Sequence, residues 1–490
     1  MALLVSLNIA SLHRASGAEI NIARVSNTTY HYDKALDKSK EPIIPDPQLF
    51  QPSSHTANTR NRRDLPTTSE CAVHLELLEV FHTLRDRVQQ STDLDNTFGI
   101  TPNTRKVYRK RYSSKLRKYE SYTVTVRDTR FETRRKDKWH YFLELAVGRF
   151  SRWIRAVNRV AFSGTDSQNE SEPAGLGLLP PVDVLMVWHA FLLNPDDFDF
   201  YCVKHRLERM RKAPLPWQRI HEAINSRDWS YHLPETHKEW LEKKAECKPD
   251  LFETLVELGK CESHAKHVLS QYGSGSKTSS FSLLKYIDTP ANYAFVEMVQ
   301  ATRAEALRNK PLKANVERQF KFVEKMHDHL WIRSPAVDGT LRRAIDRYEK
   351  FLQLFRDYPK TTLVPTLDVD LAWHTHLCNP EQYRTSSVER AGLMVNHDDK
   401  LGKSFLQTRF DRTHELFQIA FGQQYHVCLC WDCEAVSSAM EAFVANDDMD
   451  IIDDVGCDAD SIVKKVEDDV RYYRAVEIAR LKGTALPVRS

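Results

Sequence analysis

Glycine is scarce in this chain, with 15 residues among 490, and the motifs that depend on glycine are missing. Neither the G-x-G-x-x-G fingerprint of dinucleotide-binding folds nor the G-x-S-x-G turn of serine hydrolases occurs. The stretch YGSGSKTSS resembles a phosphate-binding loop, but Ser276 stands where a Walker motif requires glycine before Lys277. These absences argue against nicotinamide-dependent, serine-hydrolase and P-loop nucleotide chemistry.

Long apolar runs and a regular cysteine framework are also missing. No stretch of about twenty apolar residues occurs, so we expect no membrane span. The N-terminal MALLVSLNIASL has no basic residue and is interrupted by Asn8, so we do not expect a secretory signal. The nine cysteines are unevenly spaced, which is typical of a reducing compartment. We therefore expect a cytoplasmic or nuclear protein, and the net charge of +3 indicates no general attraction to polyanions.

The most informative pattern is a motif that occurs twice. PTLDVDLAWHTHLCNPEQY, residues 365–383, repeats PPVDVLMVWHAFLLNPDDF, residues 180–198, at an offset of 185 residues (365 − 180). The match extends upstream to two similar amphipathic segments, in which Arg149 aligns with Arg347. This offset is far longer than a solenoid repeat, so the pattern predicts one tandem duplication. Each unit should be an amphipathic helix, a loop, and a short helix that carries Trp-His and ends at Asn-Pro.

Apolar residues at helical spacing dominate the chain, and only residues 119–126 alternate as a strand would. We predict a mainly α fold with few strands, in which two related helical units form one large domain or two fused domains. The expected divisions are a disordered N-terminal segment (1–66), the first unit (67–270), a linker (271–285), the second unit with a cysteine cluster (286–445), and an acidic stretch with a C-terminal helix (446–490).

The residues shared by both copies of the motif are expected to be structural. Trp188 and Trp373 should anchor the core, and His189 should hydrogen-bond to a backbone carbonyl or a carboxylate, as buried histidines do. Asp183 and Asp368 suit the positive ends of their helices.

A polar site, if present, is predicted in the second unit. Asp370, His374 and Cys378 are four residues apart and share a helix face, whereas the first unit has Leu185, His189 and Leu193 there. His374 is expected to be a hydrogen-bonded core histidine or, alternatively, a metal ligand or general base oriented by Asp370. The candidate polar residues are Asp370, His374, His376, His397 and Asp398. Of these, Asp370, His374 and His397 form the two-histidine, one-carboxylate set of iron oxygenases if the fold assembles them.

Three cysteines lie within six residues, at Cys428, Cys430 and Cys433, and the last two have the spacing found in structural zinc sites. Zinc is therefore a candidate cofactor, with a fourth ligand from His426, His397 or Cys457. The alternative is that these are reduced cysteines packed under the last helices.

Residues 105–119 form a basic tract in which Tyr108, Tyr112 and Tyr119 lie between lysines and arginines. Tyrosines can stack on bases while lysines and arginines bind phosphates, so nucleic acid is one candidate partner. The alternatives are a solvated surface, or pairing within the chain to the acidic residues between Asp447 and Asp460.

The segments RYEKFLQLF, LVPTLDVDLAWHTHLCNPEQY, NHDDK and FGQQYHVCLCWDCEA resemble the glycine-rich domain-containing protein-like family of plants and fungi, over roughly Thr67 to Pro487. The resemblance implies no established reaction, and it implies a link to stress, hormone and developmental responses. Some plant members carry a glycine-rich tail or an RNA-binding domain, and this chain shows neither pattern.

Two functions follow from these observations. The first is a non-enzymatic regulatory or adaptor protein whose paired units form a cleft for a protein partner. The second is a metal-dependent enzyme, of hydrolase or oxygenase type, that uses the histidine, aspartate and cysteine groups of the second unit.

Overall fold

The computed structural model describes residues 33–34, 41–51, 64–100, 104–127, 129–162, 178–260, 263–274, 290, 293–297, 299–301, 310–398, 400, 402–446 and 455–489. Most of the predicted linker 271–285 and the acidic residues 447–454 lie outside these ranges. Among the described helices, none combines the length and apolar character needed to cross a membrane.

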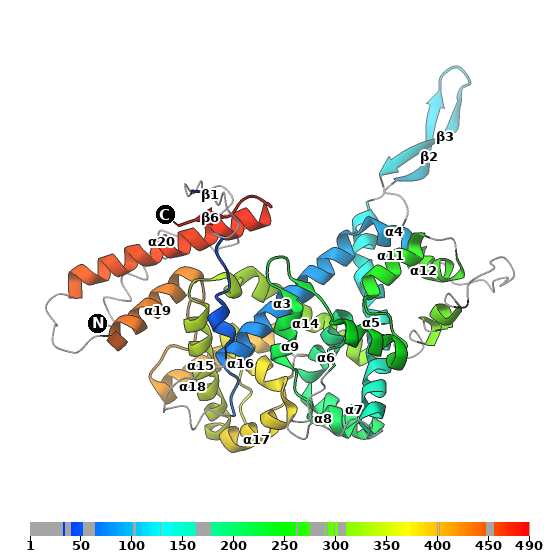
Figure 1. The fold of residues 1–490 in the computed structure, drawn as a ribbon. Helices are drawn as coiled ribbons and strands as arrows, with labels where there is room; N and C mark the ends of the chain where they lie inside the picture. The colour runs from blue at the N-terminus through cyan, green and yellow to red at the C-terminus, as the bar shows by residue number, and fades with distance from the viewer. Residues whose placement is uncertain are drawn as a thin grey trace.

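Helices make up most of the described chain, so the prediction of a mainly α fold is confirmed (Figure 1). Those of the first half are α3 (Thr68–Gln90), α4 (Thr92–Thr97), α5 (Phe131–Phe162), α6 (Val182–Leu192), α7 (Pro195–His205), α8 (Glu208–Lys212), α9 (Trp217–Ala223), α10 (Glu235–Trp240), η4 (Leu241–Ala245), α11 (Leu251–Lys260) and α12 (His264–Ser274). Those of the second half are α14 (Lys310–His329), η6 (Trp331–Arg333), α15 (Val337–Asp357), α16 (Leu367–Leu377), α17 (Pro380–Ala391), α18 (Lys403–Phe421), α19 (Trp431–Asn446) and α20 (Val455–Leu481).

The described strands form three two-stranded antiparallel sheets. These are β1 (Asp33–Lys34) with β6 (Pro487–Val488), β2 (Thr104–Ser113) with β3 (Lys118–Arg127), and β4 (Ile224–Asn225) with β5 (Ser230–Tyr231). The alternation at residues 119–126 predicted β3. The basic tract before it is the partner strand β2, which extends away from the helices (Figure 1).

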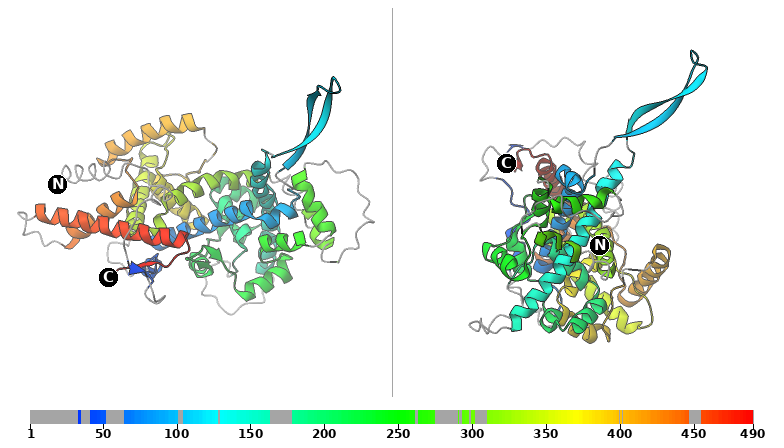
Figure 2. Two further views of the ribbon diagram at one scale, coloured as in Figure 1. Left: turned by 90° about the horizontal axis from the view of Figure 1, so that it is seen from above. Right: turned by 90° about the vertical axis from the view of Figure 1, so that its right-hand side faces the viewer.

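Helix α3 lies at the centre of the molecule and contacts α5, α9, α14, α15 and α16 (Figures 1 and 2). Thr67 and Glu70 form a capping box at its start, in which each side chain accepts a hydrogen bond from the other residue's backbone N–H. Most of its side chains are buried, including His74 and Glu76. A helix buried on most sides belongs to the interior of a large core.

Each Trp-His helix packs on the amphipathic helix that precedes it in the chain, α6 on α5 and α16 on α15. A small pocket separates the corners that follow the two helices, and its lining includes Pro195 and Pro380. Asp199 and Arg384, which differ by the same 185 positions (384 − 199), pair across it at 2.6 Å. Contact between equivalent residues is what two units related by a twofold axis would make. The tandem duplication itself stays a prediction.

Within the N-terminal segment 1–66, for which we predict disorder, a short described part packs on the body. The 3₁₀ helix η2 (Pro47–Phe50) buries Leu49 and Phe50, and Phe50 stacks on His221 with ring centroids 3.9 Å apart. The sequence does not indicate the packing of η2, because a short segment with two apolar residues has no periodicity to detect. Residues 1–32, 35–40 and 52–63 lie outside the described chain. The proposed domain boundaries stay predictions.

Candidate metal centre

The carboxylates at the starts of the two Trp-His helices are buried against arginines. Asp183 accepts a hydrogen bond from Arg149 Nε at 2.6 Å, and Asp368 accepts one from Arg347 Nε at 2.7 Å. Burial raises the pKa of Asp183 despite the neighbouring charge of Arg149. Each aspartate therefore does more than start a helix, because it is the buried partner of the arginine aligned in both copies.

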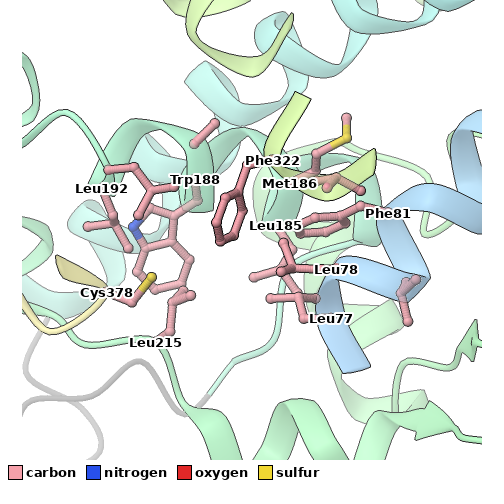
Figure 3. Close-up of a cluster of buried hydrophobic side chains, with 14 of the residues drawn as sticks. Leu77, Leu78, Phe81, Leu185, Met186, Trp188, Leu192, Leu215, Phe322 and Cys378 are labelled. Carbon is pink, nitrogen blue, oxygen red and sulfur yellow. The ribbon is translucent and has the colours of Figure 1, made fainter. Parts of the chain in front are cut away.

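Both motif tryptophans are buried, as expected of core anchors. Trp188 lies in an apolar cluster formed by α3, α6 and α14, in which Phe322 stands between Trp188 and Phe81 (Figure 3). Trp373 donates from Nε1 to the hydroxyl of Tyr383 at 3.0 Å.

His189 belongs to a hydrogen-bonded chain that crosses from one unit to the other. The hydroxyl of Thr375 donates to the carbonyl of Leu371 at 2.8 Å, so it accepts from His74 Nδ1–H, also at 2.8 Å. In the neutral ring His74 Nε2 carries no proton and accepts from His189 Nε2–H at 2.8 Å. Burial lowers the pKa of both imidazoles, that of His189 to about 3. Because hydrogen bonds alone satisfy this chain, His189 needs no metal.

His374, at the equivalent position of α16, has different neighbours. Its Nε2 lies 3.0 Å from Nε2 of His397 and 3.2 Å from Oδ1 of Asp370. The distance between Nε2 of His397 and Oδ1 of Asp370 is 3.6 Å. Asp370 and His374 occupy successive turns of α16, and His397 comes from the loop after α17. Three ligand atoms, two imidazole nitrogens and one carboxylate oxygen, therefore face one small space.

The surroundings orient these groups. His397 Nδ1 donates to the carbonyl of Leu193 at 3.1 Å, which leaves its Nε2 unprotonated in the neutral ring. A histidine held by its second nitrogen on a backbone carbonyl is the usual arrangement around a bound metal. Burial raises the pKa of Asp370, but His374 and His397 lower it by more, so it lies below its ordinary value. The side chain of Asp370 is 22% exposed, although its ligand atom Oδ1 is itself buried.

The fold does not bring the remaining predicted polar residues to this centre. His376 Nδ1 meets the hydroxyl of Tyr348 and its Nε2 meets that of Ser386, each at 2.9 Å, in the buried interior. Asp398 is exposed and accepts from the backbone N–H of Lys400 at 3.0 Å. Cys378 is buried near Trp188 and Leu192 (Figure 3).

The three clustered cysteines do come together. The sulfur atoms of Cys428, Cys430 and Cys433 lie within 4.8 Å of one another just before and within the first turn of α19. Hydrogen bonds from the other two thiols lower the pKa of Cys428, which favours a thiolate in the cluster.

Two reciprocal hydrogen bonds fix the position of this cluster. Trp331 Nε1 donates to the carbonyl of Leu429 at 2.9 Å, and Trp431 Nε1 donates to the carbonyl of His329 at 2.8 Å. His329 therefore lies beside the cluster, whereas His397 belongs to the Asp370–His374 centre. Sequence reasoning missed His329 and His74, because each lies outside the repeated motif and gains its neighbours from distant parts of the chain.

Comparison with known proteins supports the resemblance seen in the motif. Residues 250–385 match the family model described as glycine-rich domain-containing protein-like. Glycine-rich domain-containing proteins 1 and 2 of Arabidopsis thaliana are 37% and 33% identical to this chain over 97 residues. Each alignment covers 18% of this chain and 12% of the relative, so the chain spans a small part of the relatives' length. No solved structure matches.

The matched range is shorter than the predicted resemblance of roughly Thr67 to Pro487. It includes α14, α15, α16 and the ligand candidates Asp370 and His374, whereas His397 and the cysteine cluster lie outside it. The second Trp-His helix thus lies within the range that matches the family model. The similarity to the glycine-rich domain-containing protein-like family therefore covers residues 250–385 of this chain.

Proposed function

We propose that this chain binds a divalent transition metal at Asp370, His374 and His397 and uses it in a metal-dependent reaction. The observation that carries the proposal is the triangle of ligand atoms, with sides of 3.0, 3.2 and 3.6 Å. Three ligands bound at about 2.1 Å lie roughly 3.0 Å apart around an octahedral metal and 3.4 Å apart around a tetrahedral one. The observed sides are close to both values.

The donor set suits two kinds of chemistry. Two histidines and one carboxylate leave open positions on iron(II) for oxygen and substrate, as in oxygenases. The same set on zinc leaves one position for a water molecule, which the metal acidifies for hydrolysis. Identifying the bound metal as iron or zinc therefore distinguishes an oxygenase from a hydrolase.

We propose a separate structural zinc site at the cysteine cluster, completed by His329 or by water. The described cysteines are free thiols, which suits the reducing cytoplasmic or nuclear location predicted from the sequence.

The test is metal analysis of purified protein in which Cys428, Cys430 and Cys433 are all replaced by serine, after reconstitution with iron(II) without oxygen or with zinc. We expect about one metal ion per chain, lost in His374→Ala and in Asp370→Asn. His189→Ala removes the equivalent imidazole of α6 and should leave the metal in place. Circular dichroism of each variant checks that it folds.

If the protein without the three clustered cysteines takes up neither metal, the metal-dependent proposal is wrong. The regulatory or adaptor function predicted from the sequence, with an unidentified protein partner, is then the proposal that remains.

A further inference from the structure

The ribbon formed by β2 and β3 has no counterpart elsewhere in the described chain. Its ten residue pairs run from Thr104 opposite Arg127 to Ser113 opposite Lys118, and the two strands contact chiefly each other. Figures 1 and 2 show it standing away from the helical body. A two-stranded ribbon alone in water is only marginally stable. An apolar or aromatic face exposed on such a ribbon is therefore expected to bind another molecule.

The ribbon is strongly basic although the chain is not. Residues 104–127 contain nine lysines and arginines and one acidic residue, Glu120, for a net charge of +8 (9 − 1). The whole chain carries +3, so the rest of it carries −5 (3 − 8). Among the described side chains, no ion pair involves a lysine or arginine of the ribbon. A partner that matches this charge is a polyanion.

The two faces of the ribbon differ. Directly paired residues share a face, and one face carries three tyrosines, two lysines and no acidic residue. We call it the tyrosine face: Lys106, Tyr108, Lys110, Tyr112, Tyr119, Ser121, Thr123 and Thr125. Tyr108 is 83% exposed and Tyr119 is 70% exposed. The opposite face carries Glu120 and one tyrosine, Tyr122, together with Arg109, Arg111 and Lys118, so the basic charge is spread over both faces and the tyrosines are concentrated on one.

We propose that the tyrosine face binds single-stranded nucleic acid. Exposed aromatic rings stack on unpaired bases, and neighbouring lysines bind the phosphates between them. Tyr112 and Tyr119 already meet edge to face at 5.3 Å, which holds each ring in a defined position. In a duplex the faces of the bases are covered by stacking, and an acidic protein has no bases. Either partner could bind the lysines and arginines of the ribbon, but neither would stack on its tyrosines. The inference does not depend on the metal centre.

The acidic residues between Asp447 and Asp460 are a competing partner within the chain. Residues 447–454 lie outside the described chain, and the helix that follows them, α20, lies at the other end of the molecule from the ribbon (Figures 1 and 2). Nucleic acid is therefore the better match for the ribbon.

Fluorescence polarisation of the full chain with labelled 12-mers of oligo(U), oligo(dT) and a mixed-sequence duplex tests the proposal. We expect both single strands to bind more tightly than the duplex. If four phosphates are contacted, raising salt from 50 to 200 mM should weaken binding about 50-fold. Comparing oligo(U) with oligo(dT) tells whether RNA or DNA is preferred.

Tyr108→Ala and Tyr119→Ala should each weaken single-strand binding about tenfold or more, because each removes a stacking surface. Tyr122→Ala is the matched control on the opposite face and should change the affinity less than twofold. His374→Ala should leave binding unchanged. The proposal is overturned if the duplex binds as tightly as the single strands, if Tyr122→Ala weakens binding as much as Tyr108→Ala, or if no nucleic acid binds at 50 mM salt.

Discussion

Helices α6 and α16 carry Trp-His at the same place in similar motifs, yet their histidines have different partners. His189 meets another histidine, His74, in a chain that hydrogen bonds complete. His374 meets His397 and Asp370, and the atoms that converge there are all metal-ligand types. Leu185 stands in α6 where Asp370 stands in α16. The comparison indicates that the surroundings of the histidine in each copy are set by one position within the motif and by a histidine that reaches it from outside.

The largest expected effect comes from the part that both copies share. Trp188→Ala or Trp373→Ala should lower the free energy of unfolding by about 3–5 kcal/mol, as truncation of a buried aromatic does. Trp188→Ala should lower the free energy of unfolding more than Trp373→Ala does. Trp188 is 0% exposed, against 4% for Trp373, and it packs on Trp153. Urea unfolding measures the difference. A variant as stable as the wild type would mean that its tryptophan is not a core anchor.

The next largest effect is expected from the buried arginine–aspartate pairs. Arg149→Met leaves Asp183 buried without its partner, which should cost about 3–5 kcal/mol. Arg347→Met should cost less, because the side chain of Arg347 is 12% exposed against 2% for Arg149. The control is Arg149→Met with Asp183→Leu, which should recover part of the loss because no unpaired charge remains. Equal losses in the single and double variants would contradict this account.

Asp370→Leu gives α16 the residue that α6 has and tests the comparison directly. A polar group on a core-facing helix costs free energy unless it is paired or bound, and Asp370 is paired with His374 and His397, so the metal-free variant should be slightly less stable than the wild type. Metal binding at His374 should be lost. Thermal unfolding with and without added metal separates the two effects, and retention of the metal would show that Asp370 is not a ligand.

The smallest effect concerns a histidine whose pKa is raised rather than lowered. Burial lowers the pKa of His327, but its 2.9 Å hydrogen bond to Glu79 raises it more, so the folded value exceeds the ordinary 6.5. The stabilisation is therefore fully present below about pH 6.5 and is lost as the pH rises through the folded pKa. His327→Gln should be destabilising by roughly 0.5 kcal/mol at pH 5.5 and by less at pH 8.5. An equal cost at both values, measured by urea unfolding, would contradict a charged His327.

The positions of many elements could be read from local patterns. Apolar residues at helical spacing in residues 70–89, 138–160, 336–358 and 400–421 indicate the helices α3, α5, α15 and α18, and the Asn-Pro corners mark the ends of the Trp-His helices. The same spacing in residues 198–212 indicates one helix, whereas the structure has two, α7 and α8. The break comes at Arg206, whose backbone is left-handed (φ 55°), a conformation that spacing does not reveal.

The candidate site was only partly predictable. Asp370 and His374 are one turn apart on one helix, so their proximity follows from helix geometry. His397 was named as a third ligand only if the fold assembled the set. Its approach depends on the loop after α17, and its orientation depends on the carbonyl of Leu193, which comes from the other unit.

The sequence by itself determined the helical class, the two related motifs, the adjacent pair Asp370 and His374, and the close spacing of the cysteines, because each depends on residues a few positions apart. Tertiary structure alone decided that His74 would complete the hydrogen bonds of His189, that His397 would reach His374, and that His376 would be buried away from them. These contacts join residues from 10 to more than 100 positions apart. No local pattern encodes them, because they arise from how α3, α6, α16 and the loop after α17 pack into one core.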